Sequence, residues 1–226
     1  MHQKIVLFGV NDVNDYPSDL VNPRKSASSL EGTVLPPAHH SFIYRAAIVS
    51  SIFVTIISTL PYFYAPPGIS DTWQAWTPTI STIALVAFGW MYSAPPFRLK
   101  EIPLVDSTTN SLMCWLMWFT GFSTCYTLSG MSCSLRDVPT VVNALVLVAI
   151  GDHALAAAVD LKADTHAGHR TVATFLGIRG CAMVATAAYA AALLMEGFKS
   201  IFGVYFAGGL CVVLSQRRDY GWLCKY

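Results

Sequence analysis

Six long apolar runs constrain the fold of this 226-residue chain more than any other feature. They cover approximately residues 42–63, 73–93, 108–129, 138–159, 177–196 and 198–214. Each is near the length at which an α-helix, rising roughly 1.5 Å per residue, crosses about 30 Å of hydrocarbon. We therefore expect an all-α, multi-pass transmembrane helix bundle of about six full spans. Pro78 marks either the true start of the second helix or a kink within it.

The composition agrees with a membrane protein. Hydrophobic residues make up 54% of the chain and charged residues only 12%, whereas soluble domains carry roughly 25% charged residues. The formal net charge is +1, and no dense basic run predicts binding to nucleic acid. The six cysteines show no CxxC or paired spacing, so we expect buried apolar side chains and no disulfide framework or zinc site.

The start of the sequence predicts a short N-terminal helix stub. Only the seven residues 4–10 of this largely apolar segment precede Asn11, whereas a spanning helix needs about 20 apolar residues. Either this segment lies at the membrane interface or helices upstream of it are missing, and we favour the second alternative. The stretch Ile5–Val10 is too short for the core of a signal peptide, and acidic residues follow it directly.

Basic residues orient the predicted bundle in the lipid bilayer. If the spans alternate in direction, the loops on one side hold 11 Lys and Arg residues, and the opposite loops hold only Arg136 and Lys199. By the positive-inside rule, the basic side faces the cytosol or its equivalent. The two acidic clusters of the chain fall on that same side, which is an independent indication that they meet.

A pair of aspartates closes the fourth apolar run. Asp160 and Asp164 are four residues apart, so on a helix they share one face with Cβ atoms roughly 5–6 Å apart. Two bare carboxylates this close repel each other, and ionisable residues at the end of an apolar helix are costly and usually functional. The pair predicts a site for a divalent cation, and the alternative is an ordinary surface helix end.

The other acidic cluster lies near the N-terminus, in a polar segment, residues 11–40, that we expect to be a surface loop. The cluster contains Asn11, Asp12, Asp15 and Asp19. Most of these residues are four apart, so at a helix end they would form one acidic face. Oxygen ligands in this number suit Mg²⁺, which commonly takes one or two carboxylates together with substrate phosphates. The alternative is a solvated polar loop.

Basic residues lie between the two acidic clusters in the sequence Tyr92-Ser-Ala-Pro-Pro-Phe-Arg98-Leu-Lys100. The two prolines stop the helix, and Arg98 and Lys100 then fall on the predicted acidic side. Arg suits bidentate contacts with phosphate and Lys a point-charge contact, although both residues could be ordinary positive-inside anchors. Acidic clusters, basic residues and a large apolar bundle together predict an isoprenoid diphosphate bridged by Mg²⁺ as the ligand.

These motifs resemble those of the UbiA superfamily of intramembrane prenyltransferases. The matching pieces are Asn11-Asp12-x-x-Asp15-x-x-x-Asp19, Tyr92-Ser-Ala-Pro-Pro-x-Arg98-x-Lys100 and Asp160-x-x-x-Asp164-x-x-x-Gly168-x-x-Thr171. Their order and the four spans between the acidic motifs also match, over about residues 5–180. Asp19-x-x-Asn22-Pro23-Arg24-Lys25, and His153 with the tail Thr-Val-Ala-Thr-Phe-Leu-Gly, look closest to the lycopene elongase type.

The resemblance implies a membrane-embedded enzyme that transfers alkyl groups other than methyl. It implies Mg²⁺-dependent transfer of a prenyl group from an allylic isoprenoid diphosphate to a lipophilic acceptor, either a polyene or an aromatic ring. The superfamily has more helices than this chain offers. We therefore expect a single domain over residues 1–226 that is incomplete at both ends, with its acidic motifs on the positive-inside face.

The resemblance also implies roles for individual residues. The expected metal ligands are Asn11, Asp12, Asp15, Asp19, Asp160 and Asp164. The expected diphosphate-binding residues are Tyr92, Arg98, Lys100, Lys162 and Arg170. The expected catalytic residues are Asp15, Asp160, Asp164 and His153. His153 removes a proton from the acceptor, lines the acceptor site or is a hydrogen-bonded core residue. Trp115, Trp118 and Phe119 either shield an allylic cation or pack within the bundle.

Two other functions fit the same residues. A terpene cyclase of the UbiA type would ionise the same diphosphate and then fold the cation onto its own chain. An inactive, truncated lipid-binding protein or a transporter would keep the helices without turnover. The lack of intramembrane charge pairs beyond the aspartate motifs argues against ion-coupled transport.

Overall fold

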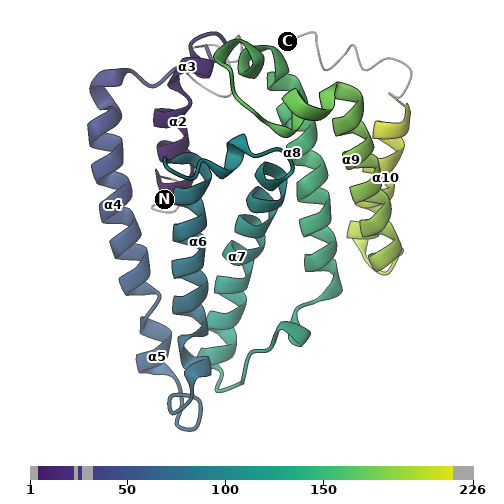
Figure 1. The fold of residues 1–226 in the computed structure, drawn as a ribbon. Helices are drawn as coiled ribbons and strands as arrows, with labels where there is room; N and C mark the ends of the chain where they lie inside the picture. Colours follow the sequence, from purple (N-terminus) through teal and green to yellow (C-terminus); the bar gives the residue numbers. More distant parts are fainter. Residues whose placement is uncertain (1–4, 23–24, 27–32, 216–226) are drawn as a thin grey trace. The chain divides into compact units, whose positions relative to one another are not determined.

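The computed structural model describes residues 5–22, 25–26 and 33–215, and within these ranges every regular element is a helix (Figure 1). The expected all-α fold is therefore confirmed. Pro23 and Arg24, the sixth cysteine, Cys224, and the basic residues of the C-terminal segment lie outside the described residues.

The chain forms two compact units that alternate along the sequence. The first unit comprises residues 1–14, 35–97 and 113–138, and the second comprises residues 15–34, 98–112 and 139–226. One boundary falls inside helix α7 (Val105–Leu128), whose residues up to Leu112 belong to the second unit. A single domain over residues 1–226 stays a prediction.

The N-terminal segment packs against two long helices of the first unit. The elements of this unit are a π-helical turn η1 (Ile5–Gly9), α2 (Val10–Asn14), η2 (Pro37–His39), α4 (His40–Ile57), α5 (Leu60–Tyr64), η3 (Trp73–Trp76), α6 (Thr77–Ser93), the later part of α7 and η5 (Leu135–Asp137). Figure 1 shows η1 and α2 beside α4 and α6. A Cβ on Gly9 would lie 2.9 Å from Ile43, and one on Gly89 would lie 2.7 Å from Leu7. The expected stub is therefore a closely packed helical segment.

Polar side chains join the helices of the first unit. Trp90 Nε1 donates a hydrogen bond of 3.0 Å to Ser51 Oγ, which links α6 to α4. Thr120 Oγ1 donates at 3.0 Å to Ser81 Oγ, which links α7 to α6. Such hydrogen bonds between membrane helices contribute on the order of 1 kcal/mol each.

Prolines define both ends of α6. Residues 73–76 form η3, and α6 begins at Thr77 with Pro78 in its first turn, where the missing N–H group has no intrahelical partner to lose. Pro78 thus marks the helix start and not a kink. The helix ends at Ser93, just before Pro95 and Pro96, as expected.

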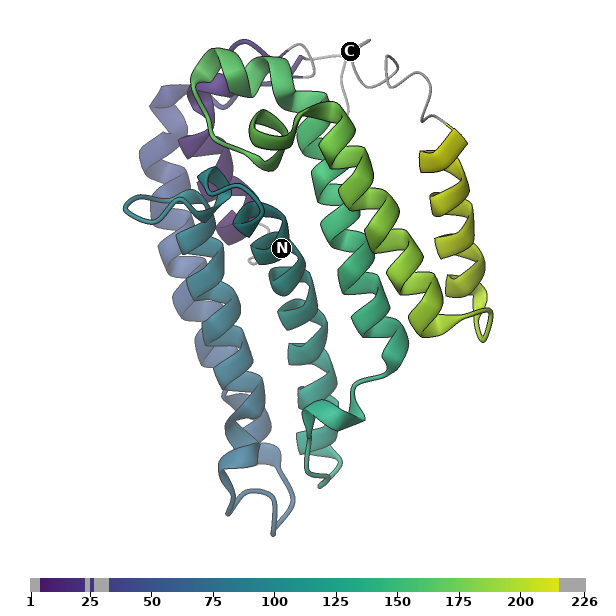
Figure 2. The ribbon, with the colours of Figure 1, turned by 45° about the vertical axis from the view of Figure 1, so that its right-hand side comes forward.

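The second unit is built on three neighbouring helices. Its elements are α3 (Tyr16–Asp19), η4 (Leu99–Glu101), the first part of α7, α8 (Thr140–Ala167), α9 (Val172–Glu196) and α10 (Ile201–Ser215). Figure 2 shows α8 beside α9 and α9 beside α10. The α8–α9 contact is rich in buried alanine, and a Cβ on Gly151 would lie only 3.0 Å from Ala185 Cα. Small residues of this kind allow helix backbones to approach closely in a membrane.

Among the residues that the structure describes, three helical segments are long and apolar enough to cross a membrane: residues 37–64, 140–167 and 172–196. The chain is thus an integral membrane protein. The six apolar runs all form helices, but α6 has 17 residues and α10 has 15, and Asp106, Asn110 and several hydroxyl side chains interrupt the apolar surface of α7. Length and composition alone therefore support three spans where the sequence predicted about six.

The cysteines in the described part of the chain are all free thiols. Cys133 and Cys181 are buried, whereas Cys114, Cys125 and Cys211 are exposed. The expected burial is therefore wrong for the three exposed side chains.

Candidate active site

The second unit brings three distant chain segments together around the Asp160–Asp164 pair. They are residues 15–22 with Lys25, residues 98–106 and residues 153–172. Asn22 Nδ2 donates a hydrogen bond of 2.8 Å to Asp160 Oδ1, between residues 138 positions apart. The segment that follows the first acidic motif therefore touches the second motif directly.

The end of α8 fixes the geometry of Asp164. Gly168 adopts a left-handed conformation with φ 76°, which a glycine reaches without strain, and ends the helix. The His169 amide donates to the Asp164 carbonyl oxygen at 2.9 Å. Beyond this reversal, Thr171 Oγ1 donates to Asp164 Oδ2 at 3.3 Å. The carboxylate and the backbone of Asp164 are thus both held by the turn that follows it.

Asp15 and Lys100 form an ion pair within the second unit. The Lys100 side chain is buried, with 7% of its surface exposed. Burial lowers the pKa of the Lys100 ammonium from its ordinary value, while the charge and the hydrogen bond of Asp15 oppose this shift. The first acidic motif and the basic segment after α6 therefore meet at this contact.

The two acidic motifs share one electrostatic environment. The Asp164 carboxylate lies within electrostatic reach of Asp160, of Asp15 and of Lys100. Asp15 is thus near the second motif in the folded unit, although the two are far apart in the sequence. Asp15, Asp160 and Asp164 thus belong to one unit, and a shared metal site formed by them stays a prediction.

The first motif does not form one continuous acidic helix face, nor is it part of a loop throughout. Asp15 lies between α2 and α3, with φ −93° and ψ 2°. Asp19 ends α3, is 7% exposed and lies 3.3 Å from the Lys25 ammonium. Each of these two carboxylates therefore has its own lysine, an arrangement that the spacing of the aspartates could not predict.

Arg98 contacts a carboxylate of its own segment. Arg98 Nη2 donates to Glu101 Oε1 at 2.5 Å, and its backbone lies in the left-handed region with φ 41°, which is uncommon for a residue other than glycine. His169 Nε2 is 3.9 Å from the same Glu101 oxygen, and its Nδ1 is 3.8 Å from Asp164 Oδ1. Burial lowers the pKa of His169, while the charge of Asp15 opposes the shift.

Asp106 is a buried acidic residue that the sequence reasoning did not assign. It lies in the first turn of α7, is 1% exposed, and accepts a hydrogen bond of 2.7 Å from the Val172 amide at the start of α9. His153 lies within electrostatic reach of Asp106 and of Asp160. The sequence did contain one signal for Asp106. It lies just before the third apolar run, as Asp160 lies just after the fourth.

Three other residues of this region were missed or left without a role. Asn22 and Lys25 belong to the lycopene elongase-like motif, but their contacts with Asp160 and Asp19 depend on chain folding. His169 lies in the glycine turn, where a titratable side chain is a signal that could have identified it.

Two residues expected to bind diphosphate, Lys162 and Arg170, are exposed, and within the described chain neither forms a salt bridge.

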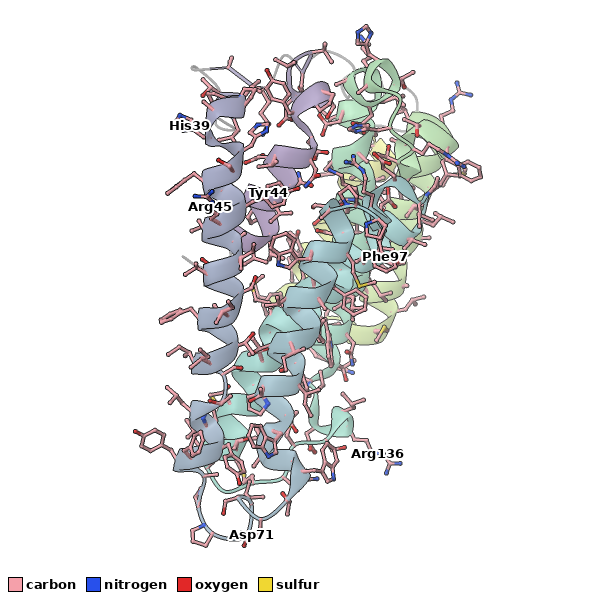
Figure 3. The ribbon with its side chains drawn as sticks, turned by 60° about the vertical axis from the view of Figure 1, so that its left-hand side comes forward. His39, Tyr44, Arg45, Asp71, Phe97 and Arg136 are labelled. Carbon is pink, nitrogen blue, oxygen red and sulfur yellow. The ribbon has the colours of Figure 1, made fainter. Side chains whose placement is uncertain are left out.

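The remaining predicted site residues belong to the first unit. Ser93 Oγ donates to Asn11 Oδ1 at 3.1 Å, so the first motif and the Tyr92-Ser93 segment meet. Asp12 is half-buried. Asn14 Nδ2, which the sequence reasoning left out, donates to Tyr44 on α4 at 2.8 Å, and Figure 3 shows Tyr44 on the inner side of α4 in this unit.

The first unit also contains apolar cavities. One, of about 250 Å³, is lined by Phe53, Val54, Ile57, Ser58, Pro61, Thr82, Thr120 and Thr124. Another, of about 180 Å³, is lined by Trp73, Thr77, Ile80, Ser81, Ala84, Trp115, Leu116, Phe119 and Leu135. The rings of Trp115 and Phe119 stack with centroids 4.6 Å apart, and Trp118 stacks on Phe122. These aromatic residues therefore pack against each other, and two of them also face a cavity.

The donor atoms of the second unit suit Mg²⁺. Among the described residues, no three His, Cys, Asp or Glu side chains form a ready group of metal ligands. Mg²⁺, however, commonly takes only one or two carboxylates and completes its octahedron with water and phosphate oxygens. The Asp160–Asp164 pair with Asp15 nearby offers such oxygens and no soft ligand, so the residues fit this ion.

Comparison with known proteins agrees with this geometry, although no family model matches the chain. It is 33% identical over 192 residues to a lycopene elongase/hydratase of Corynebacterium glutamicum, covering 84% of this chain and 60% of that protein. It is also 33% identical over 192 residues to the C(50) beta-cyclic carotenoids biosynthesis protein LbtBC of Dietzia, covering 84% of this chain and 40% of that protein. The chain thus spans about 60% of the length of the first relative and less of the second.

A solved structure shares the fold. It is a UbiA homolog from Archaeoglobus fulgidus bound to DMAPP and Mg²⁺, which matches with a TM-score of 0.62 and 16% identity over 96% of this chain and 70% of that one. The chain therefore shares the helical fold of this UbiA homolog. In sequence it is similar to proteins named lycopene elongase/hydratase over 84% of its own length.

Proposed function

We propose that this chain is part of a prenyltransferase that moves a prenyl group from an allylic isoprenoid diphosphate to a lipophilic acceptor inside the membrane. The observation that carries the proposal is the gathering of Asp15, Asp160 and Asp164 with Lys100 in one compact unit. The relatives named lycopene elongase/hydratase, and the homologue bound to DMAPP and Mg²⁺, support it. A polyene is the preferred acceptor, because the sequence relatives are named for lycopene and carotenoids.

Mg²⁺ would be held by the carboxylates of the two motifs. Asp15, Asp160 and Asp164 are the proposed ligands in the second unit, with Asp19 joining directly or through water. Bound Mg²⁺ supplies charge neutralisation for the diphosphate. Asn11 and Asp12 belong to the first unit, and their place in the same site stays a prediction.

The basic residues are proposed to differ in how directly they contact the diphosphate. Lys100 is buried next to Asp15 and is the proposed point-charge contact, since a phosphate oxygen can replace the carboxylate as its partner. Arg98 offers a second contact once it exchanges Glu101 for phosphate. Lys162 and Arg170 are exposed and would act at longer range, and Tyr92 stays a predicted contact of the first unit.

The reaction requires one bond to break, one to form and one proton to leave. The C–O bond of the donor breaks with both electrons passing to the diphosphate, a terminal double bond of the acceptor attacks the allylic carbon, and the acceptor loses a proton. His153 is the proposed proton acceptor, because an imidazole nitrogen can take up a proton and the ring lies within electrostatic reach of the carboxylates of Asp106 and Asp160. The acidic residues are expected on the cytosolic or equivalent face of the membrane.

Diphosphate release tests the proposal. The purified membrane protein is incubated with an allylic diphosphate, with and without lycopene, in Mg²⁺ or in excess chelator. Release that needs both Mg²⁺ and the polyene, with an elongated polyene as product, supports prenyl transfer. A cyclic hydrocarbon formed without acceptor would establish the cyclase instead, and the absence of metal-dependent release would leave only a lipid-binding role.

A further inference from the structure

Asp106 is a buried acidic residue of the second unit, which the proposed function uses only for its charge near His153. Its Oδ2 accepts a hydrogen bond of 2.7 Å from the Val172 amide. Its Oδ1 accepts bonds of 2.6 Å from the Ser107 amide and 3.3 Å from Ser107 Oγ. A carboxylate that is 1% exposed is costly unless such donors satisfy it, and here both oxygens are satisfied.

The group that Asp106 holds is the first amide of α9. Val172 begins that helix and is fully buried. The first amides of a helix have no partner inside it, and the positive end of the helix dipole favours a negative charge. Asp106 therefore caps α9 from another helix, in addition to the local hydrogen bonds between Thr171 and Thr174.

The capped end of α9 is adjacent to the second acidic motif. Thr171 directly precedes Val172, and its hydroxyl donates to Asp164 Oδ2 at 3.3 Å. On its other side, Thr171 is attached to the reversal at Gly168. The position of the Thr171 hydroxyl, and with it one oxygen of Asp164, therefore depends on where the Val172 amide is anchored.

We infer that Asp106 is a positioning residue for the second acidic motif, acting on Asp164 through Val172 and Thr171. The inference rests on the proposed function, because it assumes that Asp164 binds Mg²⁺ with the diphosphate. Asp106 touches neither and is not a catalytic residue. Its effect is to select one orientation of the Asp164 carboxylate before the ligand arrives, which reduces the ordering cost of binding.

The test measures binding of inorganic diphosphate in Mg²⁺ to the detergent-solubilised protein, by titration calorimetry and by the rise in unfolding temperature. The variants are Asp106→Asn, Thr171→Val and the double variant. Asparagine keeps the size of aspartate but must turn its NH₂ group toward either Val172 or Ser107, so one amide loses its acceptor. Each single variant is expected to raise the apparent dissociation constant about tenfold, which corresponds to ~1.4 kcal/mol.

The double variant shows whether Asp106 affects diphosphate binding through Thr171. If Asp106 acts through Thr171, the two losses are not additive, and the double variant binds about as weakly as the weaker single variant. Thr171→Ser keeps the hydroxyl and is expected to restore binding. Asp137→Asn is the matched control, since Asp137 also accepts a backbone amide, that of Ser134 at 2.8 Å, but is exposed in η5 of the first unit.

The outcomes separate the two proposals. If the unsubstituted protein does not bind diphosphate in Mg²⁺, the proposed function fails. If it binds and Asp106→Asn binds equally well while only the ligand-free unfolding temperature falls, Asp106 has a structural role alone and the inference is wrong. Fully additive losses in the double variant would likewise overturn it.

Discussion

The two compact units differ in what they bury. The second unit buries charge, with Asp19, Lys100 and Asp106 at 7% exposure or less, and contains the alanine-rich contact between α8 and α9. The first unit buries hydroxyl side chains of α4, α6 and α7 and contains two apolar cavities. Its charged side chains lie toward its ends, as Figure 3 shows for His39 at one end of α4 and for Asp71 and Arg136 at the other. One unit is thus suited to hold ions in a fixed arrangement, and the other leaves room for a hydrocarbon.

The difference shows how the packing of each unit suits the kind of ligand proposed for it. Carboxylates that bind a metal must be held in place, and close-packed small residues leave little room for them to move. An apolar ligand needs volume and tolerant walls, which aromatic rings and short hydroxyl side chains provide. If this comparison is correct, substitutions in the two units should affect different measurements.

The largest effect is expected from removing a carboxylate of the second unit. Asp160→Asn should reduce Mg²⁺-dependent diphosphate release by about a hundredfold or more, because the metal loses a charged ligand, while the amount of folded protein stays the same. Asp71→Asn, in an exposed loop of the first unit, is the control and should leave release unchanged. Near-normal release by Asp160→Asn would show that the metal assignment is wrong.

Packing should also distinguish the units. Gly151→Val should lower the free energy of unfolding by about 1–3 kcal/mol, since its side chain would meet Ala185 across the α8–α9 contact. The matched change is Gly121→Ala in α7 of the first unit, where a Cβ meets no atom within 4 Å and alanine is the better helix former. Equal losses for the two variants in chemical unfolding would remove the proposed contrast in packing.

The buried lysine should affect the donor and not the acceptor. Lys100→Met keeps much of the side-chain volume but removes the charge, and we expect the KM for the allylic diphosphate to rise about tenfold. The KM for the polyene should not change. Steady-state kinetics with each substrate varied in turn measure both values, and an equal rise in the two would count against a phosphate contact by Lys100.

The smallest effect is expected in the first unit. Trp115→Leu removes a ring that stacks on Phe119 and lines a cavity, and we expect the KM for the polyene to rise about threefold, in line with the ~0.6 kcal/mol of an aromatic contact. The KM for the diphosphate should stay the same. A change confined to the diphosphate would reverse the assignment of roles to the two units.

Sequence alone could predict the parts of this molecule that depend on local pattern. The apolar runs located the helices, and the spacing of Asp160 and Asp164 placed both on one turn of α8. The sequence allowed Pro78 to be either a helix start or a kink, and the fold shows that it lies at the helix start. These features follow from periodicity and from the missing amide of proline, which act over a few residues.

Contacts between distant segments could not be predicted in the same way. The partner of Asp160 is Asn22 and the partner of Asp15 is Lys100, and both contacts exist only after the segments meet. Charge sign alone also grouped Lys162 and Arg170 with Lys100, whereas the helix and turn that carry them leave both exposed. A count of basic residues predicts a side of the membrane but not the direction of each side chain.

The left-handed glycine after α8 explains a spacing in the third motif. Gly168 lies four positions after Asp164, about the length of one helical turn, and three further positions bring the chain back to Thr171 beside the same carboxylate. Inserting or deleting a single residue in this interval would rotate or displace the returning hydroxyl. Changes of length should therefore be tolerated here less well than changes of residue type, except at the glycine itself.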